Sequence, residues 1–154
     1  MNNFNWIDEY VTGLIEYCNS KDIYEIYDTL NIEILKIDKD NPTLQGNEAL
    51  YIRNYFGIEV VLIRNDLPYQ YEKFVLAHEL GHAILHVEIA QAAYNSKLVN
   101  TGKLERQADY FAIKLLDMSI NEIDHEGLTI EQIAAAEKVP TRIIELKFKN
   151  LGLF

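Results

Sequence analysis

The sequence is poor in cysteine and in positive charge. Its single cysteine, Cys18, cannot form an internal disulfide, which agrees with a reducing compartment. Fourteen lysines and arginines stand against twenty-four aspartates and glutamates, and the formal charge of −10 repels a phosphate backbone unless the basic residues gather on one face. The composition therefore disfavours nucleic acid as a partner.

Long apolar runs are also missing. The N-terminal segment mixes Asp8, Glu9 and Glu16 with its apolar residues and has no basic start, so it resembles neither a signal peptide nor a membrane span. We therefore expect a soluble, unprocessed protein of the cytoplasm that does not contact a membrane. The chain has no repeat, low-complexity tract or linker, and a hydrophobic content of 49% suffices for one core. Residues 1–154 are predicted to form a single domain.

Apolar periodicity changes from helical to strand-like near residue 31. Residues 1–31 carry apolar side chains at helical spacing, and a second short helix is expected to begin after Ser20 as its N-cap. Residues 32–64 hold three runs rich in β-branched residues, IEILKI, ALYI and IEVVLI, with turn-forming residues between them. These runs predict a small, largely antiparallel sheet.

Helical spacing returns after the strands. The predicted helices span 68–86, with Pro68 in the first turn, then 103–116, and finally 129–150 as a pair. The segment 87–102 is expected to be a loop with one short strand. The order of helices, strands and helices argues for an α+β fold.

The stretch FVLAHELGHAILH, residues 74–86, sets charged and polar residues into an otherwise apolar helix. His78 and His82 are one turn apart, about 6 Å along the axis, so their imidazoles can coordinate the same zinc ion. Glu79 points beside such an ion and suits a general base acting on water, as in zinc hydrolases with HExxH. In the alternative, a purely structural helix, carbonyls or carboxylates satisfy the histidines, but Glu79 then needs a buried partner of its own.

Catalytic zinc normally takes a third protein ligand. The metzincin spacing HExxHxxGxxH would need a glycine at position 85 and a histidine at position 88, where the chain has Leu85 and Glu88. His86 continues the helical series, but three ligands in a row on one straight helix cannot converge on a tetrahedral ion. His86 is therefore expected to be a core residue or to support a ligand.

The helix predicted over 103–116 offers two carboxylates one turn apart. Glu105 is predicted to complete the metal site, and Asp109 to accept a hydrogen bond from a ligand imidazole. A solvated acidic edge is the alternative, and the apolar residues around the two carboxylates weaken it. Both helices carry small residues that would permit close approach, namely Ala77 and Gly81 on one and Ala108 and Ala112 on the other.

The C-terminal pair, TIEQIAAAEKVPTRIIELKF, can also be weighed as a DNA-binding helix-turn-helix unit. Its second helix would offer Arg142 and Lys147 to a phosphate backbone, but also Glu145. A helix that docks on phosphates needs more local positive charge, so a packing role is favoured.

These motifs resemble the ImmA/IrrE family of zinc metallo-endopeptidases, whose members commonly show AHELGHxxLH followed by a helix reading ExxA(N/D)xFA. This chain has AHELGHAILH over residues 77–86, and its 103–116 segment fits the second pattern. The resemblance covers about residues 49–116 and implies a zincin-like metalloprotease domain. It further implies that Zn²⁺ is bound by His78, His82 and Glu105 and that Glu79 is catalytic.

The resemblance also implies a biological setting. Family members are often encoded by phages and integrating elements and act against a helix-turn-helix repressor, so an anti-repressor endopeptidase is the leading hypothesis. A zincin-like binding module that only holds the repressor is the alternative, although an intact Glu79 argues against it, and a DNA-binding regulator is a third.

Two features of the reaction stay open at the sequence level. The residue that steadies the oxyanion could be Tyr94, Tyr110 or His125. An extended substrate is expected to pair with a strand edge near the site, at residues 58–63.

Overall fold

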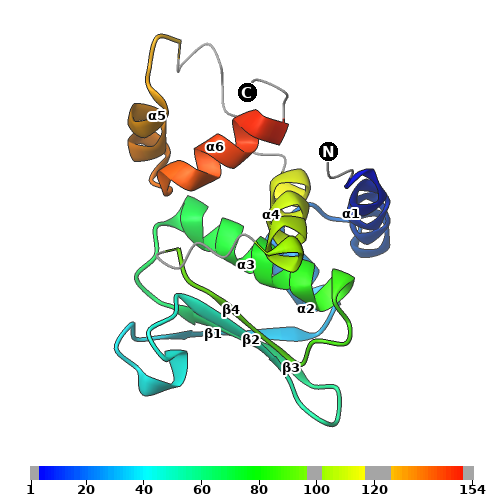
Figure 1. Cartoon of the computed structure of the whole chain (residues 1–154). Coiled ribbons are helices and arrows are strands. Elements are labelled where there is room, and N and C mark those ends of the chain that lie inside the picture. The colour runs from blue at the N-terminus through cyan, green and yellow to red at the C-terminus, as the bar shows by residue number, and fades with distance from the viewer. Residues whose placement is uncertain (1–3, 97–101, 117–125, 151–154) are drawn as a thin grey trace.

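The computed structural model describes residues 4–96, 102–116 and 126–150, which contain six α-helices, one short 3₁₀ helix (Pro42–Leu44) and four strands (Figure 1). The helices are α1 (Asn5–Cys18), α2 (Ile23–Thr29), α3 (Tyr69–Leu85), α4 (Lys103–Leu116), α5 (Ile130–Glu137) and α6 (Thr141–Asn150). The strands are β1 (Ile32–Ile37), β2 (Ala49–Arg53), β3 (Glu59–Arg64) and β4 (Gln91–Tyr94). The predicted α+β fold is confirmed. No helix within the described ranges combines the length and the apolar character that crossing a membrane requires.

The four strands form one sheet in the order β1-β3-β2-β4. Strand β2 pairs antiparallel with both β3 and β4, and β1 pairs parallel with β3. The sheet is therefore largely antiparallel, as predicted, and β4 is the short strand expected within 87–102. The expectation that residues 58–63 offer a free edge is wrong, because β3 is hydrogen-bonded on one side to β1 and on the other to β2. Of the described strands, β1 and β4 form the edges.

Two helix starts differ from the prediction by one or two residues. Asp22, not Ser20, is the N-cap of α2, because its Oδ1 accepts hydrogen bonds from the amides of Tyr24 and Glu25 at 2.9 and 3.0 Å. A carboxylate is favoured there by the positive end of the helix dipole. Pro68 has an extended backbone and occupies the N-cap of α3, so the first turn begins one residue later, at Tyr69.

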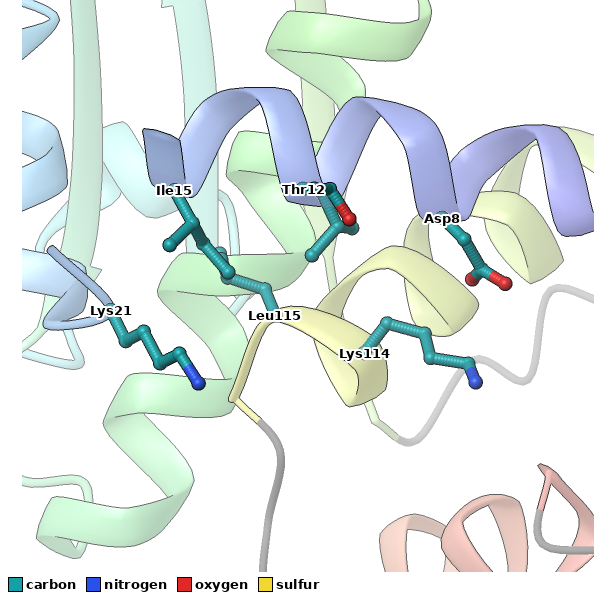
Figure 2. Close-up of a pocket in the computed structure, with 7 residues that line it drawn as sticks. Asp8, Thr12, Ile15, Lys21, Lys114 and Leu115 are labelled. Carbon is teal, nitrogen blue, oxygen red and sulfur yellow. The ribbon is translucent and has the colours of Figure 1, made fainter. Parts of the chain in front are cut away.

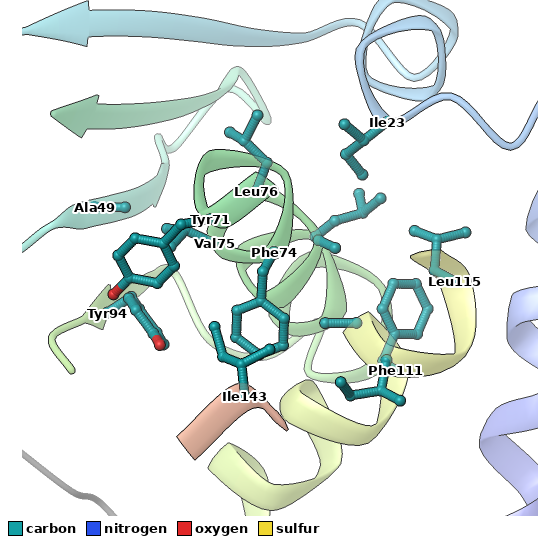
Figure 3. Close-up of a cluster of buried hydrophobic side chains, with 14 of the residues drawn as sticks. Ile23, Ala49, Tyr71, Phe74, Val75, Leu76, Tyr94, Phe111, Leu115 and Ile143 are labelled. Atoms are coloured by element: carbon teal, nitrogen blue, oxygen red, sulfur yellow. The ribbon is translucent and has the colours of Figure 1, made fainter. Parts of the chain in front are cut away.

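Helix α3 lies between the sheet and α4 and is buried on almost every side (Figure 1). Figure 3 shows Tyr71 and Val75 pointing toward Ala49 of β2 on the sheet side, and Phe111 of α4 on the opposite side. A helix that is apolar all round is stable only when surrounded in this way. The arrangement places His78, Glu79 and His82 inside the protein, at the boundary between α3 and α4.

The contact between α3 and α4 is close at Gly81. A Cβ atom at this position would lie 3.2 Å from the Cα of Ala108 and 3.3 Å from its carbonyl oxygen. Such distances are shorter than ordinary van der Waals contacts, and backbone atoms cannot rotate away from them. Gly81 and Ala108, two of the small residues predicted to permit close approach, therefore do so, and this approach brings the polar residues of α4 to those of α3.

Gly81→Leu is expected to lower the free energy of unfolding by about 1–3 kcal/mol, because the new side chain is forced against the Ala108 backbone. Urea denaturation measures the change. Gly13→Leu is the matched control, since Gly13 is also a helical glycine but has no atom within 4 Å of its added Cβ. Equal stability of the two variants would contradict the close packing of α3 on α4.

Candidate metal centre

Three predicted ligands meet between α3 and α4. The ligand atoms of His78, His82 and Glu105 all lie within 4.8 Å of one another. Glu105 Oε2 is 3.1 Å from His78 Nε2, and Glu105 Oε1 is 3.1 Å from His82 Nε2. Both imidazoles are almost fully buried, whereas the Glu105 side chain is 22% exposed. The cluster is therefore open to solvent on the Glu105 side, and one ion could contact all three groups.

Asp109 forms a hydrogen bond with the His78 imidazole at the ring nitrogen that does not face Glu105. Its Oδ1 lies 2.9 Å from His78 Nδ1, as the sequence predicts for a carboxylate that supports a ligand. A carboxylate at this position keeps a proton on Nδ1, so Nε2, which is hydrogen-bonded to Glu105, is the nitrogen that could bind a metal ion. The other oxygen of Asp109 accepts a hydrogen bond from Arg142 of α6. Arg142 thus joins the C-terminal helices to the site.

The second imidazole is supported by His86. His82 Nδ1 lies 2.9 Å from His86 Nδ1, and His86 Nε2 lies 2.8 Å from Gln107 Oε1. His86 therefore supports His82 and does not face Glu105, in agreement with the prediction that it is not a third ligand in series. Sequence reasoning missed Gln107, because nothing in the spacing of a lone buried glutamine identifies a partner.

Glu79 is fully buried and neither of its carboxylate oxygens has a hydrogen-bond partner within the described residues. Burial raises the pKa of Glu79 to about 8. His82 Nε2 is likewise buried, and its contact with Glu105 lacks hydrogen-bond geometry. Unpaired buried polar atoms are costly, so the gathering of several at one place fits a site that receives a metal ion and a polar substrate.

Glu105 and His82 have the charges that metal ligands require, whereas His78 holds an extra proton that a metal ion would have to displace. Burial alone would raise the pKa of Glu105, but contacts with His78 and His82 hold it well below its usual range. Glu105 is therefore ionised, as a carboxylate ligand must be. Burial lowers the pKa of His82, which favours the neutral imidazole that a metal requires. For His78, burial acts in the same direction, but hydrogen bonds to Asp109 and Glu105 outweigh it and raise the pKa to about 9.

The two described residues considered for stabilising the oxyanion lie in different parts of the protein, and only one lies near the cluster. The ring of Tyr94 lies 4.9 Å from the His78 ring. Its hydroxyl is buried without a hydrogen bond of ordinary geometry in the described part of the chain, although the Tyr71 hydroxyl is close enough to affect its pKa. Tyr110 instead donates to Asp8 of α1 at 2.9 Å. His125 lies outside the described residues. Tyr94 is therefore the described candidate that adjoins the cluster.

The two basic residues weighed as phosphate contacts, Arg142 and Lys147, are directed toward the protein. Arg142 pairs with Asp109, and Lys147 is only 7% exposed. Neither is presented as a phosphate-binding side chain would be. These contacts agree with the packing role favoured for the pair.

A separate pocket of about 270 Å³ lies between α1 and the C-terminal part of α4 (Figure 2). Its lining includes Asp8, Lys21 and Lys114 and none of the predicted site residues. The chemistry of HELGH is therefore not located there.

A buried HExxH helix with a carboxylate from a neighbouring helix, set beside a small sheet, defines a zincin-like metallopeptidase domain. Residues 28–151 match the peptidase M78 family, described as the IrrE N-terminal-like domain. The chain is 34% identical over 151 residues to "Metallopeptidase ImmA" of Bacillus subtilis (strain 168), covering 94% of this chain and 85% of that protein. It is 27% identical over 140 residues to "Uncharacterized immunity region protein 2" of Bacillus phage phi105, with 89% and 85% covered. The chain belongs to the ImmA/IrrE family of metallopeptidases, and the resemblance seen in its motifs is confirmed.

Proposed function

We propose that this protein is a zinc-dependent endopeptidase whose Zn²⁺ is held by His78, His82 and Glu105. The main support for this proposal is that these three groups lie together beside Glu79. Glu79 is buried and has no hydrogen-bond partner among the described residues. Two imidazole nitrogens and one carboxylate oxygen are the donor set of several catalytic zinc sites, and the fourth position then remains for water or substrate. Residues 1–154 would act as one metallopeptidase domain.

The chain's own residues divide the work of peptide hydrolysis. Zinc, when bound, supplies acidified water and polarises the scissile carbonyl. Glu79, whose ionised form a nearby metal cation would favour, accepts the proton of the attacking water and delivers it to the departing amine. Asp109 and His86 keep both ligand imidazoles oriented. The hydroxyl of Tyr94 is buried and makes no hydrogen bond of ordinary geometry among the described residues. It can therefore donate a hydrogen bond to the carbonyl oxygen as negative charge develops there.

The substrate chain is proposed to lie along β4. This strand is at an edge of the sheet, and its last residue, Tyr94, contacts His78. An extended peptide can pair with the free backbone groups of an edge strand, which gives affinity without demanding a particular sequence. The β4 edge replaces residues 58–63, which the sequence had suggested for this role.

The proposed substrate is a helix-turn-helix repressor of a phage or mobile element, so that cleavage acts as anti-repression. One relative is named a metallopeptidase and the other an immunity region protein of a phage, which supports this assignment. Such a reaction would take place in the cytoplasm, in agreement with the single cysteine. A non-proteolytic binding module remains the second candidate, and the carboxylate of Glu79 argues against it.

Mixing the zinc-loaded protein with a helix-turn-helix repressor encoded beside its gene is expected to yield discrete fragments of the repressor. Mass spectrometry identifies the fragments and the scissile bond. A chelator should reduce cleavage to the level of repressor alone, and added zinc should restore it, because the attacking water depends on the ion. A fully zinc-loaded protein that leaves the repressor intact would contradict the proposed substrate.

A further inference from the structure

Three buried side chains are hydrogen-bonded in series, from Gln107 of α4 through His86 to His82 of α3. Gln107 is 5% exposed, His86 3% and His82 1%. Gln107 Oε1 lies 2.8 Å from His86 Nε2, and His86 Nδ1 lies 2.9 Å from His82 Nδ1. Both distances are those of hydrogen bonds, and the series ends at His82 Nε2, beside Glu105.

The direction of these hydrogen bonds follows from the amide oxygen. The Oε1 of Gln107 can only accept, so His86 must carry a proton on Nε2. A neutral His86 then has its lone pair on Nδ1 and accepts a hydrogen bond from Nδ1–H of His82. With its proton on Nδ1, His82 keeps the lone pair of Nε2 free.

The same arrangement is required from the other end of the series. A metal ion beside Glu105 binds His82 only through a lone pair on Nε2, which needs the proton on Nδ1. If the amide group of Gln107 pointed its NH₂ at His86 instead, every hydrogen bond would reverse. The proton of His82 would then occupy Nε2 and block the site.

We propose that Gln107 is a positioning residue that fixes, through His86, the tautomer of His82. This inference rests on the proposed metal site and deepens it. Each ligand imidazole has its own support on α4: Asp109 holds His78 directly, and Gln107 holds His82 through one intervening histidine. The hydrogen bonds between Gln107 and His86 and between His86 and His82 are present in the metal-free protein, so the tautomer of His82 is set before an ion binds.

The test uses Gln107→Met, which keeps the side-chain volume but removes the accepting oxygen. Lys103→Met, at an exposed position of α4, is the matched control. Long-range ¹H–¹⁵N correlation spectra of the whole protein report which nitrogen of each imidazole carries the proton, in the metal-free and zinc-loaded states. Competition with a chelating dye gives zinc affinity.

In the metal-free wild type and in Lys103→Met, we expect His86 to be protonated on Nε2 and His82 on Nδ1. In Gln107→Met, both histidines should show mixed tautomers, and zinc affinity should fall by about ten- to a hundredfold, the range for losing a group that supports a ligand. A glutamine that only filled space would leave the tautomers unchanged.

Protonation of His86 on Nδ1 in the wild type would overturn the inference, and so would a Gln107→Met protein with unchanged tautomers and zinc affinity. If Gln107→Met fails to fold, the wild-type spectrum alone decides. A wild type that binds no zinc refutes the proposed function instead, because the spectrum of the metal-free protein still reports the direction of the hydrogen bonds.

Discussion

Glu79→Gln should retain zinc and bind its substrate but lose about 10²–10⁴-fold in cleavage rate, the usual contribution of a general base. The amide has the size of the carboxylate and leaves His78, His82 and Glu105 untouched, but it cannot accept the proton of water. The measurement is a paired assay on the repressor. Mass spectrometry records fragments, a pull-down records complex formation, and elemental analysis records zinc.

The charge-matched control is Glu131→Gln, which replaces an exposed carboxylate in α5 and should cleave at the wild-type rate. If Glu79→Gln relieved repression as well as the unmodified protein, proteolysis would be irrelevant and the binding-module hypothesis would take its place. If neither version bound or cut the repressor, the proposed partner would be wrong, while the zinc chemistry could still stand.

The second large effect concerns the proposed ligands. His78→Ala and Glu105→Ala should each weaken zinc binding by more than about a hundredfold, since losing a direct ligand exceeds the ten- to hundredfold loss typical of supporting groups. The loss of zinc affinity in Asp109→Ala should fall within that smaller range, because Asp109 would influence the metal only through its hydrogen bond to His78. Chelator competition on the folded variants measures each affinity.

His86→Ala provides the contrast within this series. It removes the support of His82 but no group that faces Glu105, so the protein should still bind one zinc per chain, with reduced affinity. An empty site in His86→Ala together with a filled site in Glu105→Ala would show that the third ligand had been assigned to the wrong residue.

The elements and their order were predictable because their signals are local. The helix expected over 68–86 spans Tyr69–Leu85, and the one over 103–116 has those same bounds. Helical periodicity also explains why His78 and His82 share a face, since residues one turn apart must do so. The approach of Glu105 was inferred from small residues on both helices, and Gly81 provides the room for it.

The features that sequence reasoning missed depend on contacts between distant parts of the chain. Strand β3 is interior because β1, far from it in sequence, adds to its open side in parallel. The pairs His86–Gln107 and Asp109–Arg142 join residues 21 and 33 positions apart, and neither pair has a characteristic spacing. From sequence alone Arg142 could also be interpreted as a DNA contact, because its spacing does not reveal that α6 packs against α4.

Anomalous X-ray diffraction at the zinc absorption edge, on crystals of the zinc-loaded protein, tests the central claim most directly. The account predicts one strong peak per chain, about 2.0–2.2 Å from the Nε2 atoms of His78 and His82 and from a carboxylate oxygen of Glu105. Glu79 should lie beside the peak without binding it. A peak coordinated by His86 or Asp109, or full zinc loading with no peak between α3 and α4, would contradict the account.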